Sequence, residues 1–190
     1  STLRHVLMFT GLMCVVGFFH PGLGPLIAAR ELGNAPMDLA AFTSVLALGS
    51  IAGGLLLQRN SHRFCQRPSL TLAGFALVTA VAQLGMAVGG DVPFLLAMTL
   101  LIGAGTAGLL SSSNLMTQVG STQILRGRMA GLGQIAFLGG GGLSGLIAAQ
   151  LTVSFGLQAT FAISGTLGIV LALLEIWRRG GSVLTEVRSV

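Results

Sequence analysis

Apolar residues fill six long blocks of the chain, and short polar stretches separate these blocks. The blocks cover residues 6–29, 39–57, 70–89, 94–119, 129–153 and 159–177. A helix that crosses about 30 Å of hydrocarbon at about 1.5 Å per residue needs about 20 such residues. Membrane-spanning barrel strands would be about half as long and polar at every second position, a pattern that the sequence does not show. The sequence therefore predicts an all-α membrane protein with six transmembrane helices.

The composition supports a membrane class. Hydrophobic residues make up 53% of the chain, charged residues make up only 8%, and 29 residues are glycine. A soluble domain carries far more charge than this. Because the connections between the blocks are short, we expect one bundle over residues 1–179 and a cytoplasmic tail over residues 180–190.

The arginines predict the orientation of the bundle. One lies before the first block, and others lie in alternate connections and after the last block: Arg4, Arg59, Arg63, Arg67, Arg126, Arg128, Arg178, Arg179 and Arg188. The opposite connections contain Arg30 and three acids, Glu31, Asp38 and Asp91. By the positive-inside rule, both termini are expected in the cytoplasm. The net charge of +5 then reflects topology and contact with membrane lipid, so we expect no nucleic-acid partner.

Metal ligands and disulfides are not expected. Cys14 falls inside the first span and Cys65 in a cytoplasmic loop, where thiols stay reduced. The histidines His5, His20 and His62 are scattered and do not have the spacing of a metal site. We expect no metal and no cofactor.

Two glycine motifs raise the question of enzymatic activity. Residues 103–108 match the dinucleotide fingerprint G-x-G-x-x-G, but they lie inside a span, and basic residues stand about 20 positions on, where a ribose-binding acid belongs. Close helix packing explains them better. Residues 142–145 resemble the G-x-S-G of rhomboid proteases, but the histidine that these enzymes carry on a later helix is missing. The chain is not expected to be an enzyme.

Glycines at G-x-x-x-G spacing predict close crossings between helices. Gly49 and Gly53 form one such pair in the second span, and Gly141 and Gly145 form another in the fifth. Small residues let two transmembrane backbones approach each other. The run 139–142 also weakens the fifth helix, which suits either a transporter that bends or packing alone.

Polar residues in the fourth span predict a cavity. Thr106, Ser113, Asn114 and Thr117 lie within a polar stripe on one face of that helix. Polar groups within spans are often functional. In the alternative interpretation, the hydroxyls bond back to carbonyls of their own helix.

The first span contains a second candidate for the cavity. His20 and Phe18 stand just before Pro21, where the helix must kink. His20 either binds a substrate or is a hydrogen-bonded polar residue near the interface. No acid or arginine occupies the centre of a span, so we expect energy coupling to depend on residues outside this chain.

Several short blocks resemble the carboxy-terminal half of a major facilitator superfamily transporter, most closely the branch with the enterobactin exporter and related drug-efflux proteins. The resemblance rests on residues 25–33, 49–54, 114–118, 125–129 and 154–157. The family's loop signature is partly kept, with Arg59 and Arg63 present and Gln58 in place of the acid.

The resemblance implies half of an alternating-access transporter in the bacterial cytoplasmic membrane. It would export a small amphipathic molecule, such as a drug or a siderophore-like compound. The first and fourth helices would face the cavity, and the second and fifth would face a second six-helix half, located on another chain, a missing segment or a second copy. Arg59, Arg63, Arg126 and Arg128 would anchor and gate the cytoplasmic face. Alternatively, the chain is a non-transporting structural or assembly subunit of a larger membrane complex.

Overall fold

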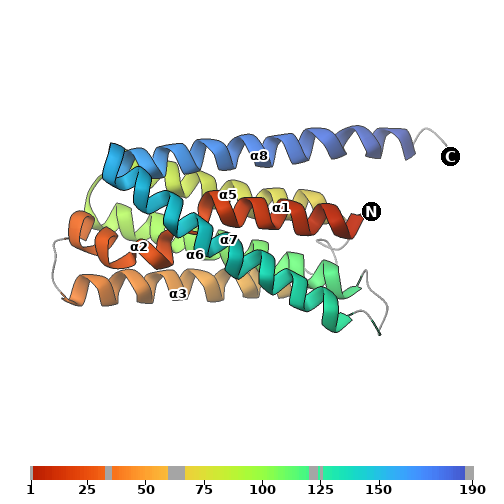
Figure 1. Ribbon diagram of the computed structural model, residues 1–190, viewed down its shortest axis with the longest axis horizontal. Coiled ribbons are helices and arrows are strands. Elements are labelled where there is room, and N and C mark those ends of the chain that lie inside the picture. Colours follow the sequence, from red (N-terminus) through yellow and green to blue (C-terminus); the bar gives the residue numbers. More distant parts are fainter. Residues whose placement is uncertain (1, 33–35, 60–66, 120–123, 125, 187–190) are drawn as a thin grey trace.

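The computed structural model describes residues 2–32, 36–59, 67–119, 124 and 126–186, and every element within these ranges is helical. Figure 1 shows long helices that run side by side along one axis. In chain order, the elements are α1 (Thr2–Gly17), α2 (His20–Ile27), the π-helix η1 (Ala28–Leu32), α3 (Pro36–Arg59), α5 (Pro68–Val88), α6 (Val92–Val119), α7 (Arg126–Phe155) and α8 (Leu157–Glu186).

Six helical segments are long and apolar enough to cross a membrane, which confirms the predicted number of spans. The segments are Arg4–Arg30, Met37–Arg59, Ser69–Val88, Val92–Val119, Arg126–Phe155 and Leu157–Arg178. Their bounds lie within a few residues of the predicted blocks. At the carboxyl end, α8 continues as a helix beyond the sixth span to Glu186, so most of the segment expected to be the cytoplasmic tail is helical. Residues 187–190 of that segment lie outside the described residues.

The first span is broken into three pieces, and proline explains the break. α1 ends at Gly17, residues 18 and 19 are not helical, and α2 begins with Pro21 in its first turn. In a continuous helix the N–H of residue 21 would bond to the carbonyl of Gly17, but proline has no N–H. The span continues through α2 into η1, a short π-helix of the kind that is frequent at functional sites.

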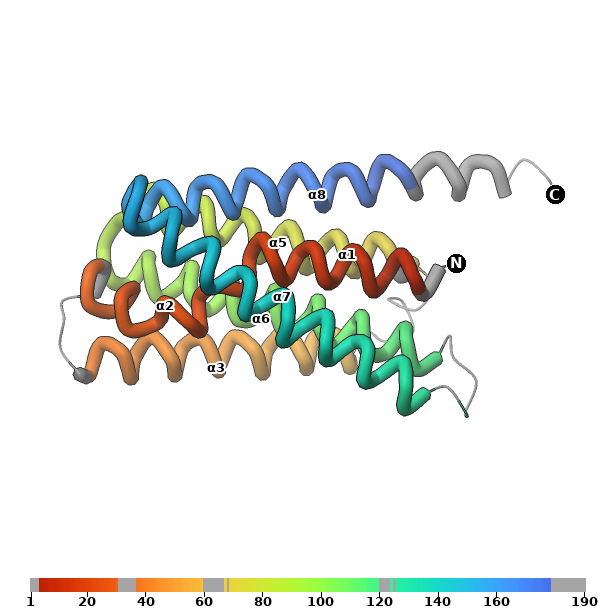
Figure 2. Tube along the Cα trace, viewed as in Figure 1, coloured from red at the N-terminus to blue at the C-terminus, as the bar shows by residue number. Residues whose placement is uncertain are grey.

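The helices pack in pairs that follow a simple rule. α6 lies between α3 and α5, α1 packs on α7, and α5 packs on α8. Let spans one, two and three correspond in order to spans four, five and six. The contact between α3 and α6, the second and fourth spans, then corresponds to the contact between α7 and α1, the fifth and first. The contact between α5 and α8, the third and sixth spans, corresponds to itself. The α5–α6 pair would become the α8–α1 pair, which packs far less closely, so the relation between the two sets of three spans is partial. Figure 2 traces the course of the spans through the bundle.

Glycines on α6 allow this helix to lie close to both neighbours. A Cβ atom added at Gly103 would overlap the carbonyl of Leu46 on α3. On the other side, one added at Gly105 would overlap Thr79, and one at Gly108 would overlap the Phe75 ring, both on α5. These contacts show that the glycines of the G-x-G-x-x-G sequence lie where α6 packs closely against its two neighbours.

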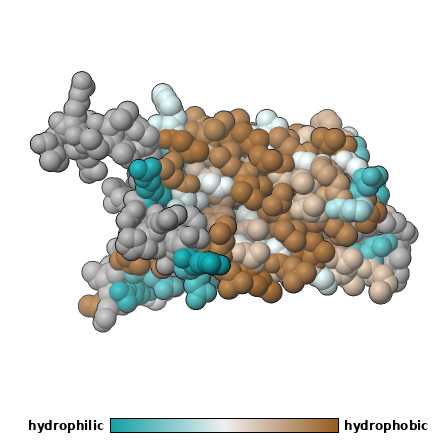
Figure 3. Space-filling view, turned by 180° about the vertical axis from the view of Figure 1, so that it is seen from behind, coloured by the Kyte–Doolittle hydropathy of each residue, from teal (hydrophilic) through white to brown (hydrophobic). Residues whose placement is uncertain are grey.

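The interior holds two apolar clusters, one toward each end of the bundle. One contains Phe19, Phe161 and Leu95, and the other contains Phe9, Leu72 and their neighbours. Apolar side chains also cover the middle of the outer surface, and hydrophilic ones lie toward the two ends (Figure 3). This distribution is what a bilayer requires, because lipid tails are as apolar as a protein core.

The start of α1 and the far end of α8 lie at the same end of the bundle (Figure 1). Helix ends that carry arginine gather there too, since Arg59 ends α3 and Arg126 begins α7. Asp91, which precedes α6, lies toward the opposite end. We call these the arginine end and the opposite end.

Candidate functional site

The largest hollow described lies between α2 and α3, toward the opposite end. Its volume is about 540 Å³. Prolines and apolar side chains make most of its wall, and His20 and Thr43 supply polar atoms; the lining includes Pro21, Pro25, Phe42 and Leu46. The hollow exists because the break before α2 separates this short helix from α3. Its volume falls in the range of about 300 to 1,000 Å³ that is typical of small-molecule pockets.

His20 is the polar group deepest in this hollow. Its side chain is only 2% exposed. The Gly17 backbone lies close enough to interact with the ring, but Nδ1 makes no hydrogen bond of good geometry within the described part of the chain. A buried ring nitrogen without a partner is costly, so a ligand or a water that bonds to it would be favoured there.

The His20 ring belongs to a short chain of aromatic contacts. Phe18 meets His20 edge to face, with 5.0 Å between ring centroids. Phe18 also meets Phe137 of α7, with 4.6 Å between centroids. These contacts connect His20 to the fifth span through the Phe18 ring.

The sequence analysis did not foresee the role of Gln83. Its side-chain Nε2 donates a 2.8 Å hydrogen bond to the carbonyl of Gly17, and the side chain is 1% exposed. This is the carbonyl that Pro21 deprives of its helical partner. Gln83 of α5 therefore stabilises the break in the first span by replacing the lost backbone hydrogen bond. A polar residue inside a span, together with a proline elsewhere that frees a carbonyl, is the signal that could have pointed to it.

The hydroxyl groups of α6 mostly bond within their own helix. Thr106 donates to the carbonyl of Ile102 at 2.7 Å, and Thr117 donates to that of Asn114 at 2.9 Å. Thr99 and Ser112 do the same. For these side chains, the alternative interpretation of the polar stripe describes the observed bonds.

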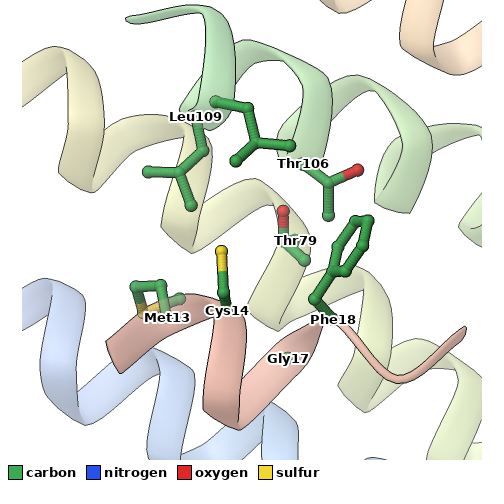
Figure 4. Close-up of a pocket in the computed structure, with 8 residues that line it drawn as sticks. Met13, Cys14, Gly17, Phe18, Thr79, Thr106 and Leu109 are labelled. Atoms are coloured by element: carbon green, nitrogen blue, oxygen red, sulfur yellow. The ribbon is translucent and has the colours of Figure 1, made fainter. Parts of the chain in front are cut away.

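Thr106 and Phe18 both border a very small void between α1, α5 and α6. Figure 4 shows the Cys14 sulfur and the Thr79 and Thr106 side chains around it. Its volume is about 10 Å³, close to the minimum for a single water. This void is too small for a substrate.

Ser113 and Asn114 line a separate pocket of about 80 Å³ between α1, α6 and α7. Thr10 and Gln134, which the sequence analysis did not place in the cavity, line it too. The predicted cavity residues are therefore divided among three spaces, and Thr117 lines none of the three described. The structure does not bring them together in one cavity.

The glycine pairs of the second and fifth spans differ in their surroundings. Added Cβ atoms at Gly49 and Gly53 would overlap the backbone of α6. On α7, a Cβ added at Gly140 would lie 2.9 Å from the Cys14 Cβ, and one added at Gly141 would lie 2.9 Å from the Phe18 ring. A Cβ added at Gly145 would meet nothing within 4 Å, so no contact within the described bundle requires glycine there.

The predicted gate arginines lie at helix ends. Arg59, Arg126 and Arg128 are exposed, and Arg63 lies outside the described residues. Among the described residues, no three His, Cys, Asp or Glu side chains gather closely enough to hold a metal ion.

No protein-family model and no curated protein sequence matches the chain.

Proposed function

We propose that this chain is one half of an alternating-access secondary transporter in the bacterial cytoplasmic membrane, working with a second six-helix half. In this proposal the arginine end and both termini face the cytoplasm, as the positive-inside rule requires. The six spans and the resemblance to the carboxy-terminal half of major facilitator transporters support it.

The main observation in support of this proposal is the outer face of α7. Gly131, Gly142 and Gly145 lie on one side of this helix, and an added Cβ at any of them would meet nothing within 4 Å. A helix surface that met only lipid would gain nothing from glycine, which weakens a helix by about 1 kcal/mol relative to alanine. Small residues on a transmembrane surface favour the close approach of another helix. We infer that the second half docks along this face.

The burial of the spans agrees with such a partner. Only 17% of the residues in the apolar windows of α3 and α7 are buried, whereas the windows of the other spans are 33% to 56% buried. These two are the second and fifth spans, the pair that would face the other half. Their packing on α6 and α1 also matches the three-plus-three inverted repeat within each half of a major facilitator transporter.

The hollow between α2 and α3 fits a small amphipathic compound. Phe42, Leu46 and the prolines offer an apolar wall, and the His20 ring, whose buried Nδ1 has no hydrogen-bond partner among the described residues, lines the hollow. The proposed activity is therefore the export of such a molecule, whose apolar body lies on the wall and whose polar group reaches His20.

The stoichiometry of the purified complex tests the pairing. A symmetric dimer, or copurification with a six-helix partner, is expected. A reconstituted complex should then transport, and His20→Phe should lower flux about tenfold, equivalent to about 1.4 kcal/mol. Phenylalanine keeps the aromatic contact with Phe18 and removes the ring nitrogens. Thr166→Val is the matched control, because this exposed hydroxyl on α8 bonds only to its own helix. Unchanged flux in the His20 variant would remove the hollow from the pathway.

One observation favours the alternative, a non-transporting subunit of a larger membrane complex. The α6 hydroxyls that bond within their own helix line no cavity wide enough for a substrate. Incorporation at fixed stoichiometry into an enzyme assembly, without flux in vesicles, would favour this second function.

A further inference from the structure

A polar pocket of about 80 Å³ lies between α1, α6 and α7, apart from the hollow at His20. It is nearer the arginine end, because Thr10 follows the start of α1 and Gln134 follows the start of α7. Its polar side chains come from three different spans: Thr10, Ser113, Asn114 and Gln134. Leu110 and Phe137 complete much of the wall.

Thr10 differs from most of the hydroxyl residues that the structure describes, and shares its lack of a hydrogen-bond partner with Ser144. Thr43, Thr79 and Thr99 each bond to a carbonyl of their own helix. The Thr10 side chain is only 4% exposed, and its Oγ1 has no hydrogen-bond partner among the described residues. A buried hydroxyl that makes no bond costs about 1 to 3 kcal/mol. A ligand in the pocket would remove that cost.

The pocket is rich in hydrogen-bond donors. Threonine and serine each supply an O–H, asparagine and glutamine each supply an NH₂ group, and each of the four also carries an oxygen that can accept. Donors from three helices converge on one small volume, where the low dielectric strengthens each bond. An acceptor group, such as a carboxylate, would satisfy several of them at once.

Charge favours an anion over a cation in this pocket. Arg4 stands six residues before Thr10 on α1, which is about 9 Å along the helix axis. Arg128 stands five residues before Gly133 of the pocket wall, about 8 Å along α7. Glu175 lies toward the same end, but on α8, which does not line the pocket. Both arginines are exposed and screened by solvent, so their positive charge favours an anion over a cation only weakly.

We propose that this pocket binds the carboxylate of an acidic amphipathic compound, an inference that rests on the proposed function. The volume holds a carboxylate and a water or two. Hydrogen bonds to an ionised acceptor are about twice as strong as neutral ones, which offsets part of the cost of removing the anion from water. The substrate class of the transporter is thereby narrowed to organic acids.

The position of the pocket agrees with a place on the transport pathway. Gln134 lies on the same side of α7 as Gly131, Leu138 and Gly142, at helical spacings of three and four. This is the side on which the second half is proposed to dock. A carboxylate held by Gln134 would thus face the space between the two halves.

The test uses the purified full chain in a neutral detergent. Benzoate, benzamide and benzylamine share one apolar body and differ only in the charge and bonding of the polar group. Benzoate should raise the melting temperature saturably, with an apparent Kd at least about tenfold lower than that of either analogue. Thr10→Val and Asn114→Leu should each weaken benzoate binding about tenfold, and Arg128→Gln should weaken it and reduce its dependence on salt.

Thr166→Val again serves as the control, and benzoate binding should not change in it. Comparable binding of all three compounds would overturn the proposal. Undiminished benzoate binding in both Thr10→Val and Asn114→Leu would also overturn it. So would a result in which phosphatidylglycerol raises the melting temperature and benzoate does not, if Thr10→Val and Asn114→Leu abolish the effect of the lipid. Two variants on different helices keep the test valid if one of them does not fold. Benzoate binding needs no second half, so its failure is separate from a failure of the pairing experiment.

Discussion

The α3–α6 crossing and the α7–α1 crossing are related by the packing of the bundle, but they use glycine differently. On α3, Gly49 and Gly53 both lie against the α6 backbone, and the outer surface carries large side chains such as Leu48 and Ile51. On α7, Gly140 lies against α1, whereas Gly142 and others face outward with nothing near them.

This difference distinguishes two kinds of exposed helix. On the outer face of α3, large aliphatic side chains such as Leu48 and Ile51 would meet a partner through side-chain contact, without a close approach of the two backbones. The outer face of α7 keeps small residues that only another helix would use. The exposed fraction alone does not distinguish α3 from α7, because the same share of residues, 17%, is buried in the apolar window of each helix.

The largest expected effect is on the α3–α6 crossing. Gly53→Leu would force a side chain into the backbone of Ala104, which cannot rotate away as a side chain could. We expect a loss of at least about 3 kcal/mol in stability, measured by thermal unfolding in detergent. The neighbouring Gly54→Leu is the control, because nothing lies within 4 Å of Gly54. Equal melting of the two variants would contradict the close crossing.

A smaller effect, on assembly only, is expected on the outer face of α7. Gly142→Leu should leave the melting temperature of the single chain unchanged and weaken its association with the second half about a hundredfold, or about 2.7 kcal/mol. Analytical ultracentrifugation in detergent measures this association. Leu174→Ala on α8 is the comparison and should leave association intact, because this exposed side chain lies outside the second and fifth spans. If Gly142→Leu associates normally, the proposed docking face is wrong.

The broken first span is a further contrast, since its packing counterpart α6 is one continuous helix. Gln83→Ala removes the hydrogen bond to the Gly17 carbonyl and should cost about 1 to 3 kcal/mol of stability. Adding Pro21→Ala restores a backbone N–H for that carbonyl. In a double-mutant cycle, Gln83→Ala should therefore cost less in the Pro21→Ala background. Strict additivity would show that the bond is not what stabilises the break.

The smallest expected effect on stability concerns one serine on α7 and one on α3. Ser144 of α7 is 1% exposed, and its Oγ has no partner in the described part of the chain. Ser50 of α3 bonds back to the carbonyl of Leu46 at 2.9 Å. Removing an unpaired buried hydroxyl should raise stability by about 1 kcal/mol, so Ser144→Ala should melt higher than the native chain. Ser50→Ala should not, and a lower melting point for Ser144→Ala would reveal a partner.

The glycines and polar residues show where prediction from the sequence stops. The G-x-x-x-G pairs indicated that the second and fifth spans cross other helices closely. On α3 the pair Gly49 and Gly53 lies at the contact, but on α7 Gly140 makes the closest one. Neighbouring residues on a helix point about 100° apart, and α7 is apolar or glycine-rich on every side, so its sequence does not fix its rotation.

Gln83, Thr10 and Gln134 were missed for a related reason. Each acts through a partner or pocket formed by another span, and no local pattern marks that relation. The hydroxyls of α6 were recognised as a stripe, but only the coordinates separate those that bond to their own helix from Ser113, which lines a pocket.

The sequence by itself determined that the chain is helical, that it has six membrane-length spans, and that its arginines fall in alternate connections. These properties follow from the length of apolar runs and from the positions of charges, both of which are local. The tertiary structure decided which glycines touch another backbone, which polar groups are satisfied, and where the hollows lie. Those outcomes depend on how each helix is rotated and which helix it meets, and in a chain this uniformly apolar the hydrophobic pattern does not specify either.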